Sequence, residues 1–169
     1  MIHGLEHFVA IDPGFAKANG TGVAVVVHKA LIDLRVERVG ADDLSVRAEQ
    51  IRQRIPTHVP HGPGHIELAK VIEHMRIYPG PQQKGDQNDL LDLAYLEGVI
   101  GAGASAVYLV PARKWKGNMP KDKMQERILG RLRQHAPQFI DGLPKAKEAR
   151  GSALEAAGLA FWTLGLLGQ

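Results

Sequence analysis

The sequence contains no cysteine, and this absence removes several classes of site at once. Disulfide frameworks, thiolate zinc sites and cysteine nucleophiles all need the missing side chain. Long apolar runs are missing too: the longest uncharged stretches, 98–112 and 156–169, are shorter than the roughly 18 residues that a membrane-spanning helix needs. The N-terminal residues also lack the basic and apolar segments of a secretion signal. We therefore expect a cytoplasmic protein without a membrane segment.

The composition is that of an ordinary folded domain. Of the 169 residues, 44% are hydrophobic and 23% are charged, which argues against an intrinsically disordered chain. A chain of this length buries roughly 70% of the surface that its unfolded form exposes, so it needs no disulfide or structural metal. We predict that residues 1–169 form a single domain.

Positive charge is concentrated in one segment. The net charge of the chain is +3, but residues 113–133 contain eight Lys or Arg and two Asp or Glu, a balance of +6 that leaves −3 for the remainder. A local basic patch on a nearly neutral body is typical of a protein with a polyanionic partner. A solvated helix face explains the same pattern equally well.

The apolar pattern predicts five strands and four helices in the order βββαβαβαα. The predicted strands are residues 7–12, 21–27, 31–39, 68–75 and 106–110, and the predicted helices are residues 42–55, 88–101, 120–135 and 145–167. Short turns join the first three strands into an antiparallel meander, and the later strands alternate with helices. Stretches rich in Pro and Gly, 56–64 and 79–86, are expected to be loops. The sequence therefore predicts an α/β fold, a mixed five-stranded sheet flanked by helices.

Three acidic residues lie in segments that are otherwise apolar. Asp12 ends the first strand, Glu73 lies near the end of the fourth, and Glu155 lies in the last helix among Ala and Leu. A carboxylate among apolar neighbours must pair with a base, take up a proton or bind a cation. Taken singly, each acid is explained by a basic neighbour at the rim of the fold.

Taken together, the three acids fit a metal site. The first strand is central in this topology and the fourth lies parallel beside it, so their C-terminal ends adjoin and a late helix can present an acid to the same point. We expect the three carboxylates to converge without a basic partner. Mg²⁺ prefers oxygen ligands, and two such ions about 4 Å apart can clamp the attacking and leaving oxygens of a phosphodiester. Gly14, just after the first strand, leaves room for a phosphate backbone.

The motifs around these acids extend over nearly the whole chain. They are Ala-Ile-Asp-Pro-Gly-Phe (10–15), Thr-Gly-Val-Ala-Val-Val (21–26), Val-Ile-Glu-His (71–74), Tyr-Pro-Gly-Pro-Gln-Gln-Lys-Gly-Asp-Gln-Asn-Asp-Leu (78–90), Trp-Lys-Gly (115–117) and Ala-Leu-Glu-Ala-Ala-Gly-Leu-Ala-Phe-Trp (153–162). In this order they resemble RuvC-type Holliday-junction resolvases of the ribonuclease-H-like superfamily, and bacteriophage-like members in particular.

The resemblance implies a homodimeric, metal-dependent endonuclease that cuts two opposed strands of a four-way DNA junction in DNA recombination and repair. It implies that Asp12, Glu73 and Glu155 are the catalytic ligands of two Mg²⁺ ions, which Mn²⁺ can replace. A further ligand position of the family, three residues before the last acid, is Ser152 here, and we expect it to bind metal weakly or through water. Glu148, two helical turns before Glu155, is a less suitable candidate for this metal-ligand position.

The resemblance also implies contacts to branched DNA. The candidates for phosphate contacts are Lys84, Lys114, Lys116, Lys121, Lys123 and Arg127. Loop 79–86, with its two glutamines, is expected beside the junction centre, and helix 88–101 is expected to form the dimer contact. A lysine near the scissile phosphate is expected either in the basic segment or on the last helix. Trp115 is either a core anchor, the favoured interpretation, or a group that stacks on a base.

The sequence also contains a histidine pattern and is compatible with two other functions. His58, His61 and His65 have a spacing that superficially suits zinc, but no cysteine or helix fixes them, so we expect no zinc site there. His74 should point away from the metals and serve packing. Two alternative functions stay open: an RNA-processing nuclease of the same fold, and a junction-binding protein whose catalysis is weakened by Ser152.

Overall fold

The computed structural model describes residues 2, 4–14, 20–74 and 87–167, with main-chain placement alone for residue 87. Its centre is a five-stranded sheet in the order β3-β2-β1-β6-β7. The strands are β1 (Phe8–Asp12), β2 (Thr21–Val27), β3 (Ala30–Glu37), β6 (Ala69–His74) and β7 (Val107–Pro111). Strands β1, β2 and β3 pair antiparallel, whereas β6 pairs parallel with β1 and with β7. The predicted mixed sheet is confirmed, including the parallel pairing of the two strands that end in Asp12 and Glu73.

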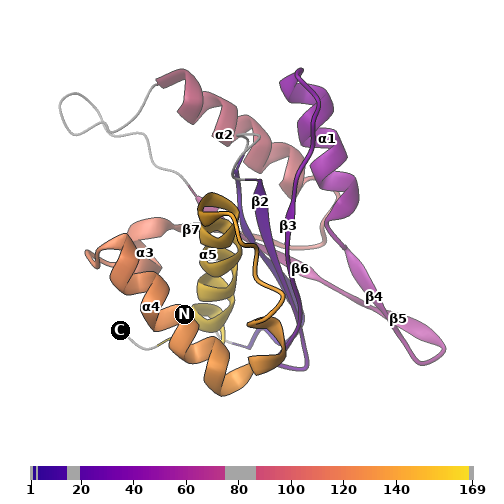
Figure 1. Ribbon diagram of the computed structural model, residues 1–169. Coiled ribbons are helices and arrows are strands. Elements are labelled where there is room, and N and C mark those ends of the chain that lie inside the picture. The colour runs from indigo at the N-terminus through magenta and orange to yellow at the C-terminus, as the bar shows by residue number, and fades with distance from the viewer. Residues whose placement is uncertain (1, 3, 15–19, 75–86, 168–169) are drawn as a thin grey trace.

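Helices cover both faces of this sheet (Figure 1). They are α1 (Leu44–Arg54), α2 (Gln87–Gly101), α3 (Ala112–Lys116), α4 (Lys121–His135) and α5 (Lys147–Thr163), with a 3₁₀ turn, η2, at Pro137–Phe139. One core joins the sheet to α5 and α4, and the other joins the opposite face to α1 and α2. The short helix α3 and the turn η2 were not predicted.

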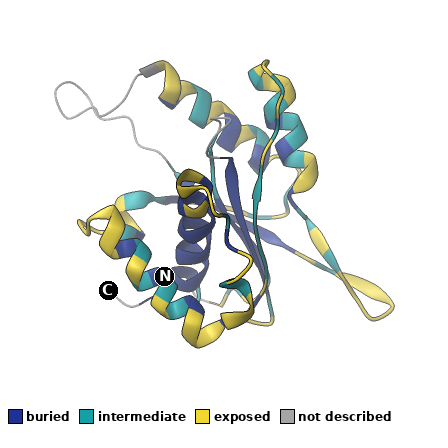
Figure 2. Ribbon diagram, in the orientation of Figure 1, coloured by how far each residue is buried: buried dark blue, intermediate teal, exposed yellow. Residues whose placement is uncertain are grey.

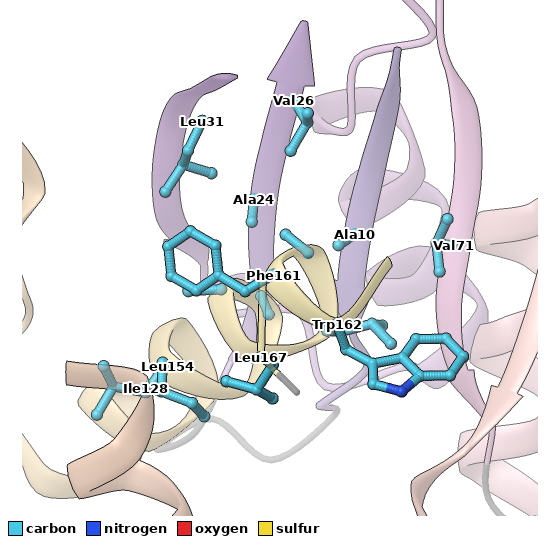
Figure 3. Close-up of a cluster of buried hydrophobic side chains, with 14 of the residues drawn as sticks. Ala10, Ala24, Val26, Leu31, Val71, Ile128, Leu154, Phe161, Trp162 and Leu167 are labelled. Atoms are coloured by element: carbon cyan, nitrogen blue, oxygen red, sulfur yellow. The ribbon is translucent and has the colours of Figure 1, made fainter. Parts of the chain in front are cut away.

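The central strands are apolar without alternation because they are buried on both faces. In β1, Phe8 and Ala10 enter the core beneath α5, and Val9 and Ile11 enter the core beneath α1 and α2. Figure 3 shows how the apolar side chains of α5, including Phe161, lie against the sheet. Figure 2 shows α5 buried along most of its length, with the exposed faces on the outer helices. The last helix is therefore sandwiched between the sheet and α4.

Two polar features fix the helices of the α1 and α2 face. Asp43 is the N-cap of α1 and its carboxylate accepts a hydrogen bond from the Val46 backbone N–H at 3.0 Å. Lys70 in β6 is fully buried, and its ammonium donates to the backbone oxygens of Ile100 (2.5 Å) and Ala102 (3.3 Å) at the end of α2. A cation at the C-terminus of a helix complements the helix dipole.

The prediction that residues 56–64 form a loop is wrong. This segment contributes β4 (His58–His61), which pairs with β5 (Gly64–Glu67) in a two-stranded hairpin that projects from the body of the molecule (Figure 1). Val59 and Ile66 are directly paired in the hairpin and pack against the core beneath α1. The many Pro and Gly residues mark its tip, where Gly62 has a φ of 55°. Within the described residues, no helix combines the length and apolarity required to cross a bilayer.

Candidate active site

The three acids predicted from the sequence lie together in the structure. Asp12 ends β1 and Glu73 lies near the end of β6, and the parallel register of these strands puts the two residues side by side. Glu155 reaches the same point from the middle of α5. Ligand oxygens of the three carboxylates all lie within 4.8 Å of one another, and among the described residues this is the one group of His, Asp or Glu side chains so arranged. Asp12 is half-buried, and the two glutamates are buried.

Glycine positions explain how α5 brings Glu155 so close to the sheet. A Cβ on Gly22 of β2 would lie 2.0 Å from the backbone oxygen of Ser152, so α5 and β2 touch through their backbones. A Cβ on Gly158 would lie 2.7 Å from the Trp115 ring. At the end of β1, the Thr21 hydroxyl donates to the Gly14 backbone oxygen at 3.1 Å and so ties the backbone just after Asp12 to the start of β2.

The expectation that the carboxylates have no basic partner is wrong. The Lys116 ammonium donates to Glu73 Oε1 at 2.8 Å and also to Glu155 Oε2. Lys121 adds an ion pair to Glu155 Oε1 at 3.0 Å. Lys116 is the last residue of α3, the unpredicted helix that directly follows β7. Both lysines had been predicted only as phosphate contacts.

Burial and the neighbouring charges shift the pKa of the three acids and of Lys116. Burial raises the pKa of Asp12 well above its usual range, and the negative charges of Glu155 and Glu73 raise it further. Burial also raises the pKa of Glu73, despite the opposing charge of Lys116. For Glu155 burial acts upward too, but Lys116 and Lys121 outweigh it and the pKa is lowered. Burial would lower the pKa of Lys116, but the three acids outweigh burial and raise it. The two ammonium groups therefore do not offset the effect of burial and of the neighbouring carboxylates on the pKa of Asp12.

Trp115 is a core residue, which confirms the interpretation that the sequence favoured. Only 5% of the residue is exposed, and it belongs to the core formed with α5. Its indole N–H donates to Glu73 Oε2 at 3.0 Å, a contact that no pattern in the sequence predicts. The ring also lies 4.8 Å from the Lys116 ammonium. The anchor therefore touches a carboxylate of the site.

A cleft of about 490 Å³ opens over the acids. Its lining includes Asp12, Gly14, Glu73, Leu93, Lys116, Met119, Lys121, Glu148, Ser152 and Glu155. Ser152 is buried in the wall one helical turn before Glu155, whereas Glu148 is exposed at the edge. The site thus combines an all-oxygen acidic floor, two ammonium groups and a partly apolar wall.

Three other predicted DNA contacts, Lys114, Lys123 and Arg127, lie outside the acidic cluster. Lys114 is exposed, and its ammonium lies 6.0 Å from the Trp162 ring centroid. Lys123 is exposed on α4 and pairs with Glu126 at 3.1 Å. Arg127, one turn further along α4, is half-buried. The remaining candidate, Lys84, lies outside the described residues, as does loop 79–86.

The histidines occupy other parts of the fold. The rings of His58 and His65 lie 5.3 Å apart on one face of the hairpin, whereas the His61 ring contacts His28. The three histidines of the zinc-like spacing therefore do not converge. His74 points away from the acids, as predicted, and its Nδ1 lies 2.7 Å from Oε2 of Glu97, a buried residue of α2.

Comparisons with known proteins give a fold but no sequence family. No protein-family model matches the sequence, and no curated protein matches it either. Among solved structures, Thermus thermophilus RuvC is similar over 96% of both chains, with 18% identity and a TM-score of 0.52. The same protein in complex with a Holliday junction substrate also matches over 96% of both chains, with 16% identity and a TM-score of 0.42. The chain adopts the ribonuclease-H-like fold of a RuvC protein, which confirms the fold class predicted from its sequence.

Proposed function

We propose that the chain is a RuvC-type junction resolvase, a metal-dependent endonuclease that hydrolyses phosphodiesters in four-way DNA junctions. The observation that carries this proposal is the convergence of Asp12, Glu73 and Glu155 within 4.8 Å at the adjoining ends of β1 and β6. The shared fold and the ordered sequence motifs support it. Action on DNA also implies a location in the cytoplasm of a bacterium or of a phage-infected cell.

The residues present fit divalent cations. The donor set is entirely oxygen, which suits Mg²⁺ or Mn²⁺, and the Lys116 ammonium between two of the carboxylates already occupies a position that favours a cation. Asp12, Glu73 and Glu155 would hold two ions, with Ser152 as a weaker or water-mediated ligand. When bound, such ions stabilise charge on the phosphate and lower the pKa of the attacking water.

The chain's own residues account for positioning of the substrate. Gly14 lines the cleft without a side chain and leaves space for the sugar-phosphate backbone. Lys116 and Lys121 lie beside the acids, so their ammonium groups are placed to donate hydrogen bonds to the phosphate that is cut. Lys114, Lys123 and Arg127 extend the basic surface, and with Lys84 they are our candidates for contacts that position DNA without reading its sequence.

A homodimer would give each of two opposed strands its own site. The apolar residues that remain exposed near the sheet edge support this part of the proposal, because a partner would cover them. They are Leu91 and Tyr95 on α2, which are 59% and 46% exposed, and Val107 and Leu109 on β7, which are 41% and 51% exposed. Leu90, Leu96 and Ile100, on the other side of α2, are buried in the core. Sedimentation of the wild type and of Leu91→Lys tests whether this surface joins two copies.

Cleavage of a synthetic four-way DNA junction in Mg²⁺ tests the proposal directly. We expect Asp12→Asn to abolish cleavage while junction binding persists, because the amide removes a metal ligand and leaves the basic surface intact. Asp122→Asn is the matched control, since Asp122 is an exposed acid on α4, outside the converging trio, and its substitution should leave cleavage unchanged. Cleavage by Asp12→Asn would refute the proposal. Preferred cleavage of structured RNA would favour the RNA-processing alternative, and binding without cutting in any divalent ion would favour a junction-binding protein.

A further inference from the structure

The two oxygens of Glu73 have different partners. Oε2 accepts a hydrogen bond from the Trp115 indole at 3.0 Å, and Oε1 accepts one from the Lys116 ammonium at 2.8 Å. Glu73 is 5% exposed, so these contacts are made away from bulk water. An indole N–H is a donor only and can never itself be a metal ligand. The carboxylate is therefore divided between a fixed donor and a cation.

The indole side of this arrangement is rigid. Trp115 is 5% exposed and packs in the core against α5, where the missing side chain of Gly158 makes room for its ring. The ammonium side is adaptable, because Lys116 has a flexible four-carbon stem and 22% of its side chain is exposed. A divalent cation can displace the flexible ammonium from Oε1, whereas the packed indole stays in place as the donor to Oε2.

This difference has a consequence for metal choice. Mg²⁺ needs near-ideal octahedral geometry and usually takes carboxylates through one oxygen, whereas Ca²⁺ accepts six to eight oxygens and often binds both oxygens of one carboxylate. We propose that Trp115 is a positioning residue that holds Glu73 as a one-oxygen ligand and so sets the preference of the site for Mg²⁺ over Ca²⁺. This inference rests on the proposed function, in which Glu73 binds metal.

The substitution Trp115→Phe isolates the hydrogen bond, because phenylalanine keeps an aromatic ring in the core and removes the N–H. Partners of metal ligands typically change metal affinity 10- to 100-fold when they are removed. We expect Trp115→Phe to lower the affinity for Mg²⁺ about tenfold while the affinity for Ca²⁺ stays the same or rises. Trp162→Phe is the matched control: Trp162 is buried in the same core at 6% exposure, and its substitution should leave the ratio of the two affinities unchanged.

The experiment is calorimetric titration of MgCl₂ and of CaCl₂ into metal-free protein without DNA, for the wild type and both variants. A ratio that shifts about tenfold toward Ca²⁺ in Trp115→Phe alone supports the inference. An unchanged ratio in Trp115→Phe, with both metals still bound, overturns the inference and leaves the proposed function standing. Failure of the wild type to bind either metal would instead overturn the proposed function.

A second measurement decides the question if Trp115→Phe does not fold. In Trp162→Phe protein labelled with ¹⁵N-tryptophan, the one remaining indole N–H signal belongs to Trp115, because the chain has two tryptophans. We expect this signal to keep its position and its protection from exchange when MgCl₂ is added. A signal that moves to the position of a free indole on addition of MgCl₂ would show that Oε2 has left the indole and would overturn the inference.

Discussion

The backbone contact between α5 and β2 gives the sharpest test of how the fold builds the site. An alanine at Gly22 would place its Cβ 2.0 Å from the Ser152 backbone oxygen and 2.6 Å from the Ser152 carbonyl carbon. Neither atom can rotate away, because both belong to the helix backbone. Ordinary contact begins at 3.4 Å, so the helix and the strand must separate by about 1.4 Å locally.

The cost of this separation is large because α5 is packed on both sides. Inserting one methyl group into a full core typically costs about 1 to 3 kcal/mol. We expect the loss for Gly22→Ala to reach about 3 kcal/mol, since the clash is with backbone and the displaced helix loses packing against the sheet, where it contacts β1, β2, β3 and β6. For a chain of this size that loss lowers the melting temperature by about 6 to 12 °C. Cleavage should fall about 100-fold even where the protein is folded, because Glu155 moves with the helix.

Urea unfolding of Gly22→Ala and of Gly130→Ala provides the assay and its control. Gly130 lies in α4, and a Cβ there would have no atom within 4 Å. The same substitution at this position should stabilise the protein by up to about 1 kcal/mol through helix propensity. Equal stability of Gly22→Ala and the wild type would refute the close contact of α5 with β2.

Three further predictions concern the charges. Between pH 3.8 and the raised pKa of Asp12, the folded chain holds a proton that the unfolded chain has released. The free energy of unfolding of the metal-free protein should therefore fall as the pH rises, and Asp12→Asn should remove this fall in urea titrations. Lys116→Met should destabilise the metal-free protein by about 2 kcal/mol in calorimetric melting, and saturating Mg²⁺ should reduce the loss. Lys123→Ala should reduce the slope of log binding constant against log salt concentration, measured for junction binding, by about 1. Lys29→Ala, which removes an ion pair with Glu6, should leave this slope unchanged.

The sequence predicted the sheet and the convergence of the acids because both follow from local patterns. Buried parallel strands read as continuous apolar runs, and an acid at the end of such a run stands out from its neighbours. Asp12 and Glu73 end two of these runs, and Glu155 interrupts an apolar helix. The hairpin of β4 and β5 escaped prediction because its Pro and Gly residues are also the residues of loops.

The partners of the acids could not be predicted in the same way. Lys116 lies at the end of a five-residue helix, which is too short to show any periodicity in the sequence. The Trp115 contact with Glu73 depends on the notch at Gly158, forty-three residues further along the chain, and no local pattern records it. Glu97, an acid on the buried side of α2, is a weak signal in the sequence for its contact with His74.

Crystallography with Mn²⁺ tests the central claim most directly. Crystals of the wild type grown in MnCl₂ and measured at the manganese absorption edge should show anomalous density about 2 Å from oxygens of Asp12, Glu73 and Glu155, with the Lys116 ammonium withdrawn from Glu73 Oε1. Manganese bound elsewhere, or Glu73 and Glu155 still paired with Lys116 at saturating Mn²⁺, would contradict metal binding by the three carboxylates.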